Sequence, residues 1–141
     1  MTINNTVKFF LNLAKAQSAL NRRFDAGLGG LGLSEFAILY HISNAEKTSM
    51  RRTDLAEDLG LTASGVTRLL APMEKVGYIK RETNPQDARV SCVVLAPGGK
   101  RKLEEAQDRA ERLAESLIPS GKENKISELS ELILELAKNV K

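Results

Sequence analysis

The sequence is poor in the side chains that build metal centres and disulfides. Its 141 residues include one cysteine, Cys92, one histidine, His41, and no tryptophan. A single thiol cannot form an internal disulfide, and one imidazole with one thiol cannot supply the clustered ligands of a structural zinc site. We therefore predict no disulfide framework, no bound metal and no other cofactor.

Long apolar runs are also missing. No stretch approaches the roughly 18 to 20 consecutive apolar residues of a membrane span, and the start of the chain, residues 1–7, is polar and lacks the basic residues that open a secretory signal. These features predict a cytoplasmic protein without a membrane partner.

Signs of catalysis are lacking as well. The chain has no paired imidazole and thiol, its carboxylates are scattered, and no phosphate-binding loop is present, so we expect no enzyme. The segment GLGGLG over 27–32 has the form of a dinucleotide-binding pattern, but it follows a helical pattern rather than a strand. It predicts a loop that ends the first helix.

The net charge of +3 is small but unevenly distributed. Residues 47–101 carry 10 Lys or Arg against 6 Asp or Glu, and the remainder carries 11 against 12. A cationic surface is therefore expected in the middle of the chain, where it suits nucleic acid, although a solvated helix face explains an imbalance of this size equally well.

Both ends of the chain carry apolar residues at helical spacing. Residues 6–26 show two apolar stripes, a heptad-like repeat follows Pro97, and a last amphipathic helix follows a break at 119–121. A helix that is apolar on two faces needs cover from a second copy or a central position in its own fold. We predict dimerisation through residues 1–32 and 101–141, with these side chains in the interface: Phe10, Leu13, Leu113, Leu117, Leu129, Ile133 and Leu136.

The middle of the chain predicts a helix-turn-helix followed by a β-hairpin. A helix capped by Ser34 comes first, a short helix over 51–59 ends at Gly60, and Thr62 caps the next helix. That helix contains Pro72, which should change its direction soon after residue 70. Residues 78–83 and 90–95 are rich in β-formers around a polar tip at 84–89. We therefore predict a mainly α fold with a small β-hairpin wing (α+β), its DNA-binding lobe spanning 33–100.

This order of elements is the winged helix-turn-helix, in which the second helix enters the major groove and the hairpin reaches the backbone or minor groove. The side chain best suited to a base contact is Arg68, because a guanidinium can donate two hydrogen bonds to guanine. In the wing, Asp87 can hold Arg89 for the minor groove, and the alternative is an ordinary solvated turn pair. The remaining candidates for contacts to bases or phosphates are Ser64, Thr67, Lys75, Arg51, Arg52 and Thr53.

Several motifs resemble the multiple-antibiotic-resistance regulator (MarR) family over nearly the whole chain. They are LSEFAIL over 33–39, DLAEDLGL over 54–61, VTRLL over 66–70, KVGYI over 75–79, and the wing sequence Asp87-Ala88-Arg89 followed by Leu95. The resemblance implies a triangular homodimer that binds a near-palindromic operator as a transcriptional regulator. It also implies a small phenolic or anionic effector, bound in a crevice between the dimer helices and the DNA-binding lobe, that shifts the population of conformers.

The sequence departs from the family pattern at several positions. Ala96 replaces a residue that would cap the following helix, and Arg51 starts a helix where a hydroxyl is common, which leaves Ser49 as a substitute cap. Cys92 is expected to be a buried, inert thiol, and the alternative is a redox switch. The alternative function is a winged-helix module that binds a protein or a small molecule without DNA.

Overall fold

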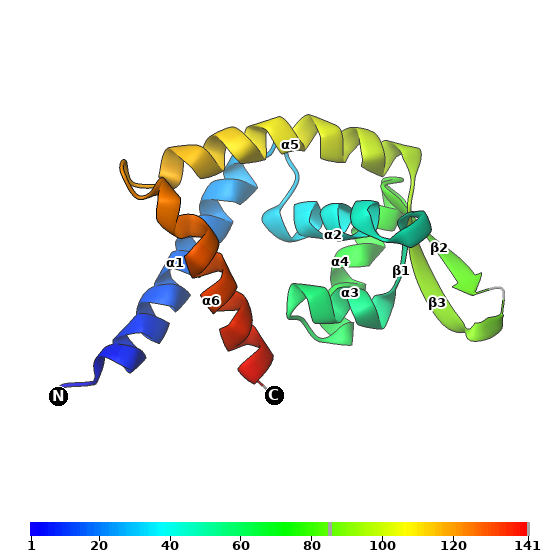
Figure 1. The fold of residues 1–141 in the computed structure, drawn as a ribbon. Coiled ribbons are helices and arrows are strands. Elements are labelled where there is room, and N and C mark those ends of the chain that lie inside the picture. Colours follow the sequence, from blue (N-terminus) through cyan, green and yellow to red (C-terminus); the bar gives the residue numbers. More distant parts are fainter. Residues whose placement is uncertain (85, 141) are drawn as a thin grey trace.

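A computed structural model describes residues 1–84 and 86–140, and Pro85 of the predicted wing tip lies outside them. One long helix, α5, joins a compact group of elements at one end to two projecting helices at the other (Figure 1). The elements are α1 (Asn5–Gly27), α2 (Leu33–Asn44), η1 (Glu46–Thr48), β1 (Ser49–Arg51), α3 (Arg52–Leu59), α4 (Ala63–Lys75), β2 (Ile79–Asn84), β3 (Asp87–Leu95), α5 (Pro97–Leu117), η2 (Glu123–Lys125) and α6 (Ile126–Asn139).

The compact group, which we call the reading head, consists of α2, α3, α4 and a sheet with strand order β1-β3-β2. Both pairings are antiparallel, with Ser49 opposite Val94 and Ile79 opposite Leu95. The predicted mainly α fold with a winged helix-turn-helix is confirmed. The short strand β1 was not predicted, and it makes the hairpin part of a three-stranded sheet.

The core of the reading head is built from the apolar stripes of its helices. Ile38, Leu39 and Ile42 of α2 are fully buried against Leu55 of α3 and Leu70 of α4. Burying a side chain of this size contributes about 1.5–3 kcal/mol relative to leaving it exposed. The helical spacing thus determines which face of each helix is left for solvent.

The glycine-rich loop after α1 packs into the same core. Leu28 and Leu31 are each 1% exposed, and Gly29 and Gly30 have φ angles of 68° and 90°. Glycine adopts these angles without a steric penalty, so the chain can turn between two buried leucines. The loop thereby fixes the end of α1 to the reading head.

Local capping confirms three expectations. Gly60 ends α3 in the left-handed conformation, Thr62 Oγ1 accepts the Gly65 N–H at 3.1 Å, and Pro97 is the first residue of α5. The N-cap of α5, Ala96, has no side-chain hydrogen bond, as its sequence predicted.

Two predicted caps are wrong. The N-cap of α2 is Gly32 rather than Ser34, because carboxylates take the free donors there: Glu35 accepts the Gly32 N–H and Asp25 accepts the Leu33 N–H. Ser49 lies in β1 and does not cap α3, whose N-cap residue, Arg51, makes no side-chain capping hydrogen bond.

Three further expectations need correction. α4 continues through Pro72 to Lys75, because the buried Met73 keeps its last turn on the core. β3 begins at Asp87, so the wing tip is shorter than residues 84–89. Cys92 is half-buried in β3 rather than buried, because it lies opposite the polar Arg51 and Glu82 on the neighbouring strands.

The two projecting helices, α1 and α6, leave the far end of α5 and carry the two chain termini (Figure 1). Neither helix has a buried residue within the single chain. Within residues 1–84 and 86–140, no helix combines the length and the apolar character needed to cross a membrane.

Candidate nucleic-acid interface

The outer face of α4 is set by the face that it buries. Val66, Leu70 and Met73 point into the core, which leaves Ser64, Arg68, Ala71 and Lys75 exposed on the opposite side. Among the described residues, neither Arg68 nor Lys75 has an ion-pair partner. Two free cations and two small side chains therefore face solvent along one side of this helix.

The side chain of Arg52, the first residue of α3, is hydrogen-bonded to α4. Its Nη1 donates to Thr67 Oγ1 at 3.1 Å, and the Thr67 hydroxyl in turn donates to the Ala63 carbonyl at 2.9 Å. The Thr67 hydroxyl is thus bonded on both sides. Arg52 Nε is buried and has no acceptor in the described structure. An N–H that is removed from water without an acceptor costs about 1–3 kcal/mol, so this donor favours the arrival of an external acceptor.

Two neighbouring clefts share the Arg52 side chain. One, of about 190 Å³, opens towards the wing, and the other, of about 420 Å³, lies against α4. The first is lined by Arg51, Arg52, Thr53, Arg89, Val90 and Ser91, and the second by Arg52, Ala63, Ser64, Thr67 and Arg68. The predicted residues of α3, α4 and the wing are therefore brought onto one face, with Lys75 further along α4.

The wing holds the predicted pair of Asp87 and Arg89. Arg89 donates through Nε to Asp87 Oδ1 at 3.1 Å and through Nη2 to Oδ2 at 3.3 Å, and its backbone N–H donates to Oδ1 at 3.0 Å. The Arg89 guanidinium, and then its backbone N–H, hold the pKa of Asp87 below its usual value. Since the Arg89 side chain is 91% exposed, the pair orients a cation outward from the sheet.

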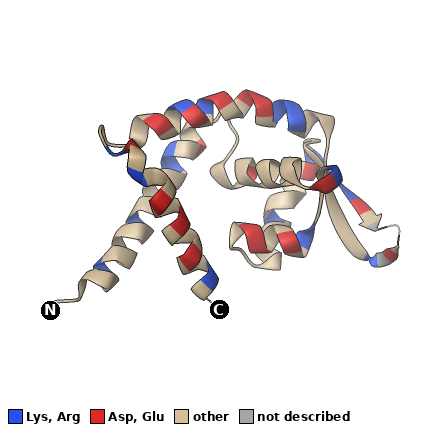
Figure 2. Ribbon diagram, in the orientation of Figure 1, with Lys and Arg blue, Asp and Glu red and all other residues tan. Residues whose placement is uncertain are grey.

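Other cations of this face are balanced by carboxylates. Arg81 of β2 pairs with Glu74 at 2.8 Å, and Arg51 approaches Asp54 at 3.8 Å. Basic positions lie on β2 and at the wing tip, whereas acidic positions recur along α6 (Figure 2). The helices and strands of the reading head carry equal numbers of basic and acidic residues, so cationic character is local to the outer face of α4, where Arg68 and Lys75 lack carboxylate partners among the described residues.

Sequence reasoning missed Ser91 and the link between Arg52 and Thr67. Ser91 lies two residues after Arg89 on β3, so the alternation of a strand could have placed both on one side. The link joins side chains 15 positions apart, and no local pattern encodes it.

The predicted dimerisation residues are mostly uncovered within the chain. Phe10, Leu117, Leu129 and Ile133 are between 41% and 48% exposed, and Leu13 and Leu136 are half-buried. Leu113 differs: it is 8% exposed and its side chain lies against Gly27 of α1. Leu113 therefore joins α1 to α5 in the same chain and offers little surface to a partner.

Comparisons with known proteins agree with this geometry. The sequence model of the MarR family matches residues 31–91, which hold α2, α3, α4 and most of the wing. The HTH-type transcriptional repressor YetL of Bacillus subtilis is 28% identical over 102 residues, which are 71% of this chain and 61% of YetL. The matched part thus spans less than two thirds of the length of that relative.

Two solved structures share the fold over nearly the full chain. Sco3205, a MarR family transcriptional regulator from Streptomyces coelicolor solved in complex with DNA, superposes with a TM-score of 0.77 at 19% identity, covering 96% of this chain and 89% of its own. The transcriptional regulator PcaV from the same organism, solved with its natural ligand, has a TM-score of 0.85 at 17% identity and full coverage of both chains. At such identities the likeness shows the fold.

The fold and the arrangement of α3, α4 and the wing define a winged helix-turn-helix protein. Its reading head, residues 31–91, matches the MarR family model, and the fold of the whole chain is that of solved MarR family regulators.

Proposed function

We propose that this chain is a sequence-specific, duplex-DNA-binding transcriptional regulator of the MarR type that acts as a homodimer, rather than an enzyme. The observation that carries the proposal is the exposed Arg68 on the outer face of α4. It is free of carboxylate partners in the described structure, and it lines a cleft that shares Arg52 with the arginine-lined cleft at the wing. In this proposal residues 33–100 bind DNA, and residues 1–32 and 101–141 form the dimer.

In the proposed complex α4 lies in the major groove. Ser64 and Arg68 face base edges near the start of the helix, and Arg68 donates two hydrogen bonds to a guanine. Thr67 contributes through Arg52, whose guanidinium it holds at 3.1 Å. Phosphates are contacted by Arg51, Arg52, Thr53 and Lys75.

The wing follows the adjacent backbone or minor groove. Asp87 limits the freedom of the Arg89 guanidinium by two side-chain hydrogen bonds, which lowers the entropy lost when Arg89 meets DNA. Both strands of the hairpin belong to the same sheet as β1, so the wing has a fixed direction relative to α3.

The terminal helices are proposed to pack against a second copy. α6 buries no residue in the single chain, although Ile126, Leu129, Leu132 and Ile133 form an apolar surface that is 41–48% exposed. Together with the exposed apolar residues of α1, this surface is what a homodimer interface would bury. A two-fold axis would place two α4 helices against successive major grooves of a near-palindromic site.

Regulation by a small molecule and a cytoplasmic location complete the proposal. PcaV was solved with its natural ligand, and the organohalide-sensing regulator RdhR-CbdbA1625 was solved with 2,4-dichlorophenol. These relatives support an effector for this chain, of the phenolic or anionic class that the family resemblance implies. A regulator that binds DNA must share a compartment with it, so we propose a cytoplasmic location.

The test is fluorescence anisotropy of labelled genomic fragments from around the gene, titrated at two salt concentrations. We expect Arg68→Ala to abolish sequence preference and Arg89→Ala to weaken binding on all sites, because base contacts specify whereas wing contacts position. Arg112→Ala is the matched control, because Arg112 is an exposed arginine on α5 that pairs with Asp108 away from the reading face. Binding that is indifferent to both reading-head variants and to salt would favour a module for protein or ligand binding.

A further inference from the structure

Thr67 is half-buried on α4, and its hydroxyl group is already engaged within the protein. The hydroxyl donates its hydrogen to the Ala63 carbonyl at 2.9 Å, and its oxygen accepts a hydrogen bond from Arg52 Nη1 at 3.1 Å. A hydroxyl has one hydrogen to donate. Thr67 therefore has no hydrogen left for the N7, O6 and O4 acceptors that bases present in the major groove.

The Thr67 oxygen keeps one lone pair, which only a base amino group could use. Two features oppose that contact. The cationic guanidinium of Arg52 lies beside this oxygen and disfavours the positive hydrogens of an amino group. The wall of the cleft that both side chains line is mostly apolar, so an amino group would lose water there without full replacement. The hydroxyl is thus poorly suited to reading a base edge.

The γ-methyl group of Thr67 is the part of the side chain that is left for an outside contact. Thr67 lines the cleft of about 420 Å³ together with Ala63, which adds a second methyl group one turn earlier on the same side of α4. The two hydrogen bonds of the hydroxyl fix the Thr67 rotamer, so the methyl group is fixed as well. In the major groove the apolar group of a base pair is the C5-methyl group of thymine, and its burial against these methyl groups is favourable.

We infer that Thr67 recognises the C5-methyl group of a pyrimidine next to the guanine that Arg68 reads. Thr67 and Arg68 are consecutive residues that line one cleft, so the two bases are neighbours. Thymine and 5-methylcytosine both carry this methyl group, and they are its two sources in DNA. The inference rests on the proposed function, because it names a base feature that α4 reads.

The experiment measures fluorescence anisotropy with one bound operator duplex in which single thymines are replaced by uracil, which lacks only the C5-methyl group. The first position to be replaced neighbours the guanine whose preference is lost in Arg68→Ala. We expect uracil there to weaken binding of the wild type about fourfold, as for the burial of one methyl-sized group. Cytosine and 5-methylcytosine are then compared at the same position. Tighter binding of 5-methylcytosine extends the recognition to both sources, and equal binding of these two restricts it to thymine.

Two variants separate the methyl group of Thr67 from its hydroxyl. Thr67→Ser keeps the hydroxyl and loses the methyl group, so it should bind the thymine and uracil duplexes equally. Thr67→Val keeps a methyl group and loses the hydroxyl, so it should retain the preference for thymine. Each ratio compares two duplexes with one protein, so a partial loss of folded protein cancels from it. Thr6→Ser is the matched control, because it removes a methyl group from an exposed threonine of α1, outside the reading head.

A thymine preference that Thr67→Ser keeps would overturn the inference, as would equal binding of thymine and uracil at every scanned position. A preference that is lost in Thr67→Val and kept in Thr67→Ser would assign base reading to the hydroxyl instead. Salt-dependent binding that needs Arg68 but ignores the methyl group refutes this inference alone. Absence of binding to any fragment refutes the proposed function on which it rests.

Discussion

Replacing Arg52 with methionine would separate a structural role of this side chain from a role in DNA binding. Arg52 gains one charged hydrogen bond to Thr67, which contributes about 1.5–3 kcal/mol, while its buried Nε lacks an acceptor at a cost of about 1–3 kcal/mol. The two effects nearly cancel, and methionine keeps an unbranched apolar stem like that of arginine. We therefore expect Arg52→Met to change the free energy of unfolding by less than about 1 kcal/mol.

DNA affinity should respond much more strongly. A phosphate oxygen would supply the acceptor that Nε lacks, so the guanidinium is fully satisfied only in the complex. Loss of one phosphate contact lowers the slope of log K against log salt by about 0.9. The assay combines urea denaturation with anisotropy titrations at several salt concentrations, and Arg112→Ala serves as the control. A loss of more than about 2 kcal/mol in stability, together with an unchanged salt slope, would refute the reasoning and make Arg52 a purely structural residue.

Three further predictions address the wing, the dimer and the start of α4. Because Arg89 holds the pKa of Asp87 below 3.8, the carboxylate stays ionised above that value, and the pair is lost only as the pH falls through the lowered pKa. DNA affinity should therefore show no titration of this group between about pH 5 and 8. Asp87→Asn should weaken binding at all these pH values in anisotropy titrations. Ile133→Asp should weaken dimerisation by at least about 3 kcal/mol, more than a hundredfold in Kd, because it would bury a lone charge in the interface. Sedimentation experiments measure this change. Glu135→Gln, the control, should leave the dimer intact. Thr62→Ala should lower the free energy of unfolding by about 1 kcal/mol in urea denaturation through loss of the cap on Gly65 N–H, and equal stability of the two proteins would contradict that role.

Features set by neighbouring residues could be predicted from the sequence. The left-handed end of α3 at Gly60 and the cap at Thr62 depend on the chemistry of one or two side chains, and both are confirmed. The pairing of Asp87 with Arg89 follows from the two-residue repeat of a strand, and it is confirmed as well. Such features form wherever the local backbone allows them.

Features that depend on distant residues could not be predicted. β1 has three residues, too few for an alternating pattern, and it is a strand because β3 offers it an edge to pair with. Glu35 and Asp25 replaced the expected cap at Ser34 because Asp25, eight residues before Leu33, reaches the helix start only after the loop has folded. The link of Arg52 to Thr67 likewise requires α3 and α4 to be packed first.

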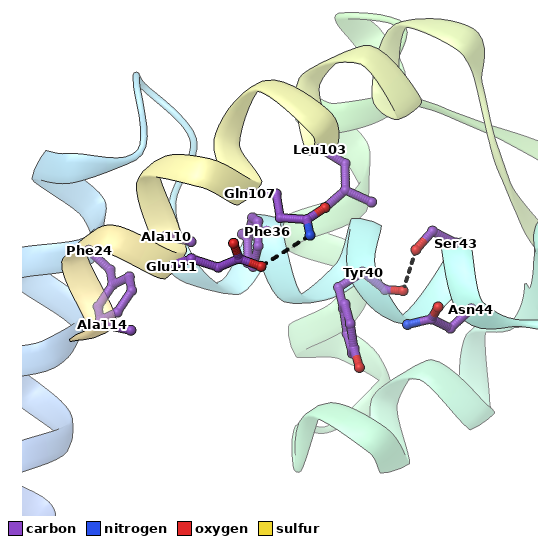
Figure 3. A pocket seen from close by; sticks show the side chains of 10 residues that line it. All are labelled: Phe24, Phe36, Tyr40, Ser43, Asn44, Leu103, Gln107, Ala110, Glu111 and Ala114. Atoms are coloured by element: carbon purple, nitrogen blue, oxygen red, sulfur yellow. Dashed lines mark hydrogen bonds between the residues drawn. The ribbon is translucent and has the colours of Figure 1, made fainter. Parts of the chain in front are cut away.

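A cavity of about 480 Å³ lies between α1, α2 and α5 (Figure 3). Its position explains how a bound ligand would affect the DNA-binding face without contacting it. Its walls are α1, which is proposed to hold the dimer, α2, which supports the reading head, and α5, which joins the two. A ligand that fits better in one arrangement of these three helices changes the distance between the two α4 helices of a dimer. A tenfold change in DNA affinity needs only about 1.4 kcal/mol of preference for one arrangement. The burial of one aromatic ring can supply that preference, so the ligand needs no contact with α4 to act as a regulator.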